Sequence, residues 1–376
     1  MLVANPFLID FFGLARGYGL AISLMMAGIY FIWRWLKTSK LINLLVFNIC
    51  AMLATYSHFT LINFYVAAFL AINAVEYYKI KNAFGSLAVN YSKPILRLLI
   101  INGINILFMF ITTLLLWEPL RKITKIHMFE YGGNKGLVSD TIYSLIVSSF
   151  YHVTVSYFWG MALSWVVAIT ILSIFIKWLY TMFRKRKSFL TESYMLIFLN
   201  CTLVVILLCS VIQHYILDND YFIGRFALFL YPLFILNVCF SFRIIHNNFP
   251  KIVITVGNIF GIILLINFLY NANVKSYLDW EYDSDTKHMM NILEKHHDKY
   301  AMGQNIKLGI TWYFEPTVNF YRITKKLDWL EPADREGLLK SDNYIYAEKN
   351  EVANFKTMRQ QVLFSSEGGA TLVYIK

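Results

Sequence analysis

The stretch YMLIFLNCTLVVILLCSVIQHYIL, residues 194–217, contains 24 residues without a single Asp, Glu, Lys or Arg. A helix needs ~20 such residues to cross the ~30 Å hydrocarbon layer of a membrane, and a helix satisfies its backbone polar groups internally. The basic run Arg184–Lys187 precedes this stretch, and Asp218-Asn219-Asp220 follows it. The segment therefore predicts a membrane span with a basic end and an acidic end.

Seven further apolar runs repeat this pattern along the first 270 residues. They cover approximately 17–35, 41–57, 59–75, 95–116, 159–180, 226–242 and 252–270. Together the runs predict an all-α polytopic membrane bundle of about eight transmembrane helices over residues 1–270. Residues 271–376 are predicted to form a small extracytoplasmic α/β domain.

The basic residues between the runs alternate from one connection to the next. One set of connections carries 14 Lys and Arg residues and the other carries 6. Because positive charge beside membrane helices stays in the cytoplasm, the first set is predicted to be cytoplasmic. Six of the eight acidic residues before position 271 fall on the other side. An even number of spans places both chain ends outside, so we expect either an outward-facing first helix or, preferably, an odd number of spans upstream of Met1.

The tail, residues 271–376, carries 14 basic and 15 acidic residues, a net charge of about −1. The membrane part therefore carries about +12, which accounts for the whole overall charge of +11, and no basic face remains for nucleic acid. Periodicity predicts helices and strands in alternation. The expected helices end near Tyr300, Lys326 and Gln360, and the expected strands are 306–311, 342–348, 361–365 and 370–375.

Four candidate site residues lie at expected outer helix ends. Arg16 offers a planar fork suited to phosphate, although Asp10 and Arg16 are also interpretable as a simple interfacial ion pair. His58, in a tight hairpin, is a candidate proton carrier or hydrogen-bond donor to phosphate. His152 has the same two interpretations. The alternative for both is a hydrogen-bonded histidine at a helix end.

Asp218 and Asp220 precede the seventh apolar run. Closely spaced carboxylates are suited to hold a divalent ion or to act as an acid–base pair. A solvated connecting loop is an equally good interpretation, so a divalent metal is a candidate cofactor only. In the longer outer segment that follows the fourth run, Ser139-Asp140 predicts the N-cap of an interfacial helix.

Three short motifs, in this order, resemble those of GT-C glycosyltransferases, and most closely the bacterial RgtA/B/C/D-like members. They are Arg16-x-Tyr18-x-Leu20, Tyr56-Ser57-His58 and Gly224-Arg225-Phe226 with its following Tyr231-Pro232. Related families are the protein O-mannosyltransferases and the lipid A aminoarabinose transferases. The resemblance spans most of residues 1–270 and implies a multi-pass enzyme of the bacterial cytoplasmic (inner) membrane.

The resemblance implies transfer of a sugar from a polyprenyl-phosphate donor to an extracytoplasmic glycan, lipid or protein, with inversion at the anomeric carbon. It places Arg16, Tyr18, His58 and Arg225 at the donor phosphate. In the family the catalytic base follows the first membrane helix, a region expected upstream of Met1. Asp10 does not match that position, so the resemblance leaves the catalytic residue unknown, and the chain as given is either incomplete or inactive.

Two other functions remain open at this point. A non-catalytic membrane scaffold is compatible with the missing base. A transporter is less favoured, because the spans have almost no charge at mid-depth and no internal repeat is evident.

Overall fold

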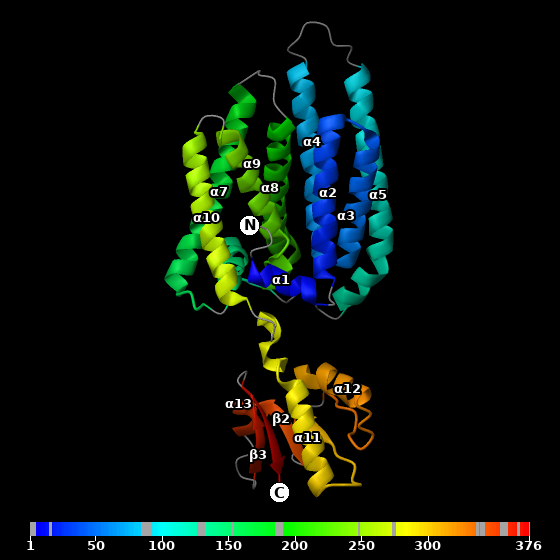
Figure 1. Cartoon of the computed structure of the whole chain (residues 1–376). Coiled ribbons are helices and arrows are strands. Elements are labelled where there is room, and N and C mark those ends of the chain that lie inside the picture. Colours follow the sequence, from blue (N-terminus) through cyan, green and yellow to red (C-terminus); the bar gives the residue numbers. More distant parts are fainter. Residues whose placement is uncertain are drawn as a thin grey trace. The chain divides into compact units, whose positions relative to one another are not determined.

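The computed structural model divides into two compact units, residues 1–272 and 273–376 (Figure 1). The residues that the structure describes are 5–14, 17–83, 92–125, 132–151, 153–184, 191–246, 249–272, 276–335, 338, 343–353, 360–366 and 369–375.

The first unit is helical, and six of its described helices are long and apolar enough to cross a membrane. This confirms the predicted helical membrane-type bundle in its coarse form. The six helices are α2 (Tyr18–Thr38), α4 (Ile62–Ala83), α5 (Ser92–Lys125), α7 (Tyr157–Arg184), α8 (Thr191–Leu217) and α10 (Pro250–Asn271).

Two of the eight predicted spans form shorter helices. The run 41–57 becomes α3 (Leu41–Ser57), and the run 226–242 becomes α9 (Leu230–His246), which are 17 residues each. In the second case the chain first forms a 3-10 turn, η4 (Gly224–Ala227), which delays the start of the helix. The count of eight spans is therefore not confirmed.

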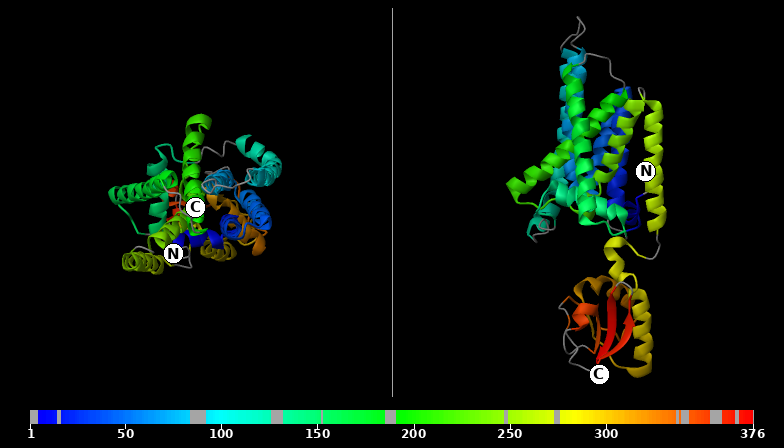
Figure 2. Two further views of the ribbon diagram at one scale, coloured as in Figure 1. Left: turned by 90° about the horizontal axis from the view of Figure 1, so that it is seen from above. Right: turned by 90° about the vertical axis from the view of Figure 1, so that its left-hand side faces the viewer.

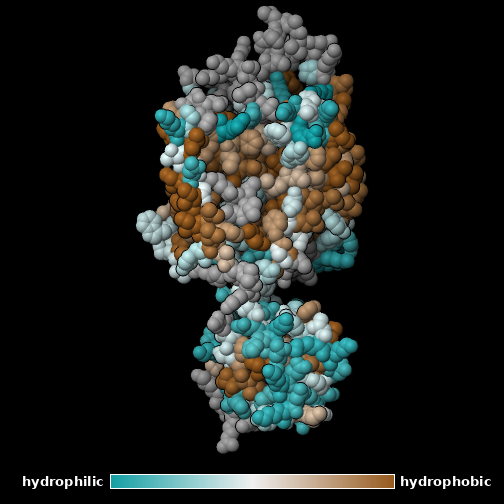
Figure 3. Space-filling view, in the orientation of Figure 1, coloured by the Kyte–Doolittle hydropathy of each residue, from teal (hydrophilic) through white to brown (hydrophobic). Residues whose placement is uncertain are grey.

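The helices alternate in direction, so the bundle has two distinct ends (Figure 1). The C-terminal ends of α2, α4, α7 and α9 lie together at one end, which is the end where the predicted cytoplasmic charges fall. The face seen in Figure 3 carries a hydrophobic band over this unit, with hydrophilic residues towards both ends. This distribution is what a helical bundle in a bilayer requires.

Small side chains and buried amides hold the bundle together. α2 packs against α3, and α4 packs against α8. Buried alanines allow this close approach, as is usual between membrane helices. Asn48 of α3 donates to Asn105 Oδ1 of α5 at 2.8 Å and accepts from Tyr65 Oη of α4 at 2.7 Å, which joins three helices. By contrast α10 lies at the periphery in both views of Figure 2, and its apolar residues are exposed along its length.

The non-spanning helices lie at the other end of the bundle. They are α1 (Pro6–Gly13) and the continuous segment η3 (Leu137–Ile142) with α6 (Tyr143–Phe150). The predicted N-cap at Ser139-Asp140 is wrong, because the helical segment already begins at Leu137. The Asp140 carboxylate instead accepts from the backbone N–H groups of Lys135 and Gly136, at 2.7 and 3.0 Å, and closes the loop before the helix.

The second unit contains a four-stranded sheet in the order β1-β2-β4-β3. β1 and β2 are parallel, whereas β4 is antiparallel to both β2 and β3. The small C-terminal sheet predicted from the sequence is thus present. The elements are η5 (Leu278–Asp283), α11 (Thr286–Tyr300), β1 (Leu308–Ile310), η6 (Trp312–Phe314), α12 (Glu315–Thr324), β2 (Tyr344–Glu348), α13 (Lys349–Val352), β3 (Gln360–Ser365) and β4 (Ala370–Ile375).

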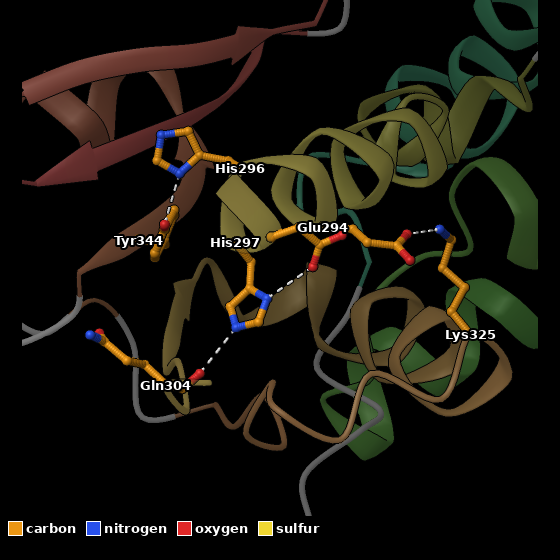
Figure 4. Close-up of polar contacts among 7 residues, drawn as sticks. Glu294, His296, His297, Gln304, Lys325 and Tyr344 are labelled. Atoms are coloured by element: carbon orange, nitrogen blue, oxygen red, sulfur yellow. Dashed lines mark hydrogen bonds and ion pairs between the residues drawn. The ribbon is translucent and has the colours of Figure 1, made fainter. Parts of the chain in front are cut away.

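α11 packs its apolar side on the sheet and fixes its polar side through several contacts (Figure 4). His296 Nδ1 lies 2.8 Å from Tyr344 Oη on β2. His297, which is buried, reaches the Gln304 carbonyl oxygen with Nε2 at 3.1 Å, and Lys325 pairs with Glu294 at 2.5 Å. These histidines therefore hold the helix to its surroundings. The predicted helix 350–360 is described only as the short α13, because residues 354–359 lie outside the described part.

Candidate functional site

Three residues that the motifs single out line one recess at the α1 end of the bundle. Tyr18, His58 and Arg225 come from the start of α2, the end of α3 and the turn η4, and Thr60 completes the polar lining. The recess has a volume of about 10 Å³, which is enough for about one water molecule. Residues separated by more than 200 positions in the sequence thus meet at one helix-end junction.

Gly17 permits this arrangement at the start of α2. It has φ +68°, a conformation that residues with a side chain rarely adopt, and a Cβ placed there would lie 2.6 Å from the Ser57 carbonyl oxygen. The start of α2 can therefore approach the end of α3 closely. As a result the ring of Tyr18 lies against the ring of His58, with centroids 4.2 Å apart, and the ring of Phe11 of α1 packs edge-to-face with Tyr18 at 4.9 Å.

His58 occupies the short connection between α3 and α4. Its backbone is extended, which ends α3, and its Nδ1 lies 2.7 Å from Thr60 Oγ1. Burial, and then the positive charge of Arg225, lowers the pKa of the imidazole from 6.5 to about 4. His58 is therefore neutral at pH 7, and it acts in this recess as a hydrogen-bonding group rather than as a cation.

Arg225 supplies the positive charge of the recess. It follows Gly224, whose φ is +48° and whose N–H donates to Ser144 Oγ of α6 at 2.9 Å. Its guanidinium carbon lies 5.3 Å from the centroid of the Phe226 ring. A guanidinium presents several N–H donors in a fixed plane and is well suited to bind phosphate. Together with the hydroxyl groups nearby, it gives the recess the chemistry of an anion site.

Asp10 is placed in α1 by a separate set of contacts. Its carboxylate accepts a hydrogen bond from Tyr151 Oη, at the end of α6. Asn5, the N-cap of α1, donates to Ser149 Oγ at 2.9 Å. These two bonds attach α1 to α6 and give Asp10 a structural role. Arg16, its predicted ion-pair partner, lies outside the described residues, as does His152.

Asp218 and Asp220 lie in the connection between α8 and η4. Asp218 is exposed and has φ +54°, whereas Asp220 is half-buried against Gly132. The loop is fixed by the Asn219 carbonyl oxygen, which lies 2.9 Å from His214 Nδ1. Among the residues described, no three His, Cys, Asp or Glu side chains group as they would around a metal ion. The metal and acid–base interpretations of this pair stay predictions.

A second polar cluster, at the opposite end of the bundle, was not predicted. Glu76 of α4 is 3 % exposed and pairs with Lys79 Nζ at 2.9 Å and with Arg97 Nε of α5 at 3.1 Å. Both cations also lie over the ring of Trp35 in α2, at 4.8 and 5.9 Å from its centroid. The signal for this cluster in the sequence is that Glu76 is one of only two acidic residues among the predicted cytoplasmic connections.

No family model, no curated protein and no solved structure matches the chain. The resemblance to the GT-C glycosyltransferases accordingly remains an expectation that rests on the three short motifs.

Proposed function

We propose that the helical unit binds the phosphate of a polyprenyl-phosphate sugar at the mouth of the recess formed by Tyr18, His58, Thr60 and Arg225, whose interior holds about one water molecule. The observation that supports this is the convergence of one guanidinium, one neutral imidazole and two hydroxyl groups at a helix-end junction. Arg225 would provide charge and paired N–H donors, and His58 would provide a hydrogen bond without adding a second charge.

The position of the recess at one end of an apolar bundle also fits a lipid-linked donor. Such a donor keeps its hydrocarbon chain beside the apolar helices and its phosphate at the boundary of the membrane. Exposed apolar residues cover the surfaces of α5, α7 and α10, so the bundle offers extensive surface to hydrocarbon chains. We propose that this end faces the outside of the cell.

The proposed reaction is the transfer of the sugar to an extracytoplasmic glycan, lipid or protein. The acceptor oxygen forms a bond to the anomeric carbon while the bond to the donor phosphate breaks, and the polyprenyl phosphate leaves with the electron pair. Arg225 and His58 stabilise the charge that develops on this leaving group. A carboxylate takes the proton of the acceptor hydroxyl. We assign this role to no carboxylate among the described residues.

Phosphate binding is tested with the full chain in lipid nanodiscs titrated with undecaprenyl phosphate. Arg225→Ala should weaken the Kd at least tenfold, whereas Arg243→Ala, at the exposed opposite end of α9, should leave it unchanged. Undecaprenol, which lacks the phosphate, should bind equally weakly to all three proteins. Equal affinities for undecaprenyl phosphate in both variants would contradict the proposal.

Transfer is measured separately, with a radiolabelled polyprenyl-phosphate sugar and membrane-derived acceptors. Turnover that falls in Arg225→Ala but not in Arg243→Ala supports an enzyme. Phosphate binding without any turnover would instead favour the non-catalytic scaffold.

A further inference from the structure

The helix α12 exposes a row of apolar side chains on its outer side. Pro316, Phe320 and Ile323 follow the spacing i, i+4 and i+7, which places them on one face of the helix. Trp312, in the turn η6 directly before α12, adds a fourth exposed apolar side chain. The exposed fractions of Trp312, Phe320 and Ile323 are 58, 56 and 65 %. We call these four residues the α12 stripe.

The inner side of the same segment makes the core contacts. Phe314 and Val318 are fully buried in the core of the second unit, and Tyr321 packs against that core. α12 also packs against α11 (Figure 1). A helix on the surface of a globular unit usually carries polar residues on its outer face, whereas this segment is apolar on both faces. The α12 stripe is therefore a surface that suits a partner outside the core.

The chain itself keeps one such partner close. α10 ends at Asn271 and η5 begins at Leu278, so only six residues connect them. Even fully extended, this connection spans at most about 25 Å between the Cα atoms of Asn271 and Leu278. A unit of ~100 residues has a radius of gyration of about 13 Å. Because α10 is long and apolar enough to cross a membrane, the second unit stays within reach of the bilayer surface.

The composition of the α12 stripe and its border fits that surface. Trp is enriched where hydrocarbon meets water, and helices that lie on membranes combine Trp and Phe with Lys and Arg. Arg322 and Lys326 lie at the C-terminal end of α12, and among the described residues neither forms an ion pair. Glu315, the only acidic residue of α12, is paired with Arg335. The charge that remains at this end is positive and complements anionic headgroups.

We propose that the α12 stripe docks on the surface of the bilayer that α10 crosses. In this arrangement Trp312, Phe320 and Ile323 enter the interfacial region, and Arg322 and Lys326 lie at anionic headgroups. The occupant is the bilayer because the short connection keeps it within reach of the stripe at all times. The inference needs α10 only as an anchor, so it does not depend on the proposed sugar transfer.

The test uses the full chain without its four native cysteines, one copy per nanodisc of phosphatidylcholine and phosphatidylglycerol. Thr324→Cys introduces a single exposed thiol beside the stripe, which is labelled with a nitrobenzoxadiazole dye. Lipids that carry a doxyl group near the headgroup should quench this dye at least twofold. Val362→Cys is the control, because Val362 is 61 % exposed but lies on β3, at the edge of the sheet farthest from β1. The dye at this position should keep its fluorescence.

The matched variant adds Phe320→Glu and Ile323→Glu to the Thr324→Cys chain. Quenching should then fall to the level of Val362→Cys. Both side chains are exposed, so the fold should be retained, which circular dichroism checks, and Phe320→Ser with Ile323→Ser is the second variant if the glutamates disturb it.

Three results would overturn the proposal. They are an unquenched dye in Thr324→Cys, equal quenching in Thr324→Cys and Val362→Cys, and undiminished quenching in both altered stripes. A second copy or another protein on the stripe would shield the dye from water without bringing it to the doxyl lipids. It would therefore give the first of these results.

Discussion

The two ends of the helical unit use similar residues in different ways. At one end Arg97, Lys79 and the ring of Trp35 surround the buried carboxylate of Glu76. At the other end Arg225 and the ring of Tyr18 border a small recess with His58, whose low pKa keeps it neutral. The first arrangement joins α4 to α5, and the second presents hydrogen-bond donors at the α1 end of the bundle. An arginine beside an aromatic ring therefore does not by itself show whether the pair stabilises the fold or binds a ligand. The neighbouring residues decide between the two roles.

The largest expected effect comes from removing the carboxylate at the first end. Glu76→Ala leaves two cations close together without their shared counter-charge, and breaking a buried ion pair in this way costs roughly 3–5 kcal/mol. Because Arg97 is partly exposed, we expect a loss near the lower limit of that range. The measurement is unfolding of the purified protein in mild detergent.

The matched control for this change is Glu118→Ala. Glu118 pairs with Lys122 at 3.7 Å, but both side chains are exposed, so the change should alter stability by less than about 1 kcal/mol. Equal unfolding behaviour of Glu76→Ala and Glu118→Ala would show that the Glu76 cluster contributes no more than a surface pair. The contrast between the two ends would then lose its basis.

A smaller effect is expected at the second end from Gly17→Ala. The new Cβ meets the Ser57 carbonyl oxygen and imposes a positive φ on alanine, so a cost of about 1–3 kcal/mol is expected. The same change separates Tyr18 from His58 and should weaken undecaprenyl phosphate binding. Gly103→Ala is the control, since a Cβ at that position in α5 meets nothing within 4 Å. A Gly17→Ala protein with unchanged stability and binding would show that the recess does not depend on this close approach.

The helical unit was largely predictable because span formation depends on local sequence. An uninterrupted apolar run of sufficient length forms a helix wherever it is inserted, as 194–217 illustrates. Helix ends were less predictable, since they depend on contacts with other segments. The turn η4 shortens the seventh predicted span, and Asp140 caps a loop rather than the helix that its sequence position indicates.

The candidate site was predictable only as a set of positions. Tyr18, His58 and Arg225 each lie at the same predicted side of the bundle, so the alternation of charge between the spans already assigns them to one end. Their geometry depends on Gly17, and its close approach to Ser57 is a tertiary contact. The Glu76 cluster also joins distant segments, and its sequence signal is only an acidic residue among the basic, predicted cytoplasmic connections. Arg16 and His152 lie outside the described residues and remain predictions.

The central claim is that the two ends face opposite sides of the membrane, with the Arg225 recess outside. It is tested most directly by cysteine labelling of intact cells that express a variant without its four native cysteines, into which Asp218→Cys or Arg243→Cys is introduced. Both positions are exposed, and they lie at opposite ends of the bundle. A membrane-impermeant maleimide should label Asp218→Cys in intact cells and Arg243→Cys only after the cells are opened. Labelling of Arg243→Cys alone in intact cells would contradict the account.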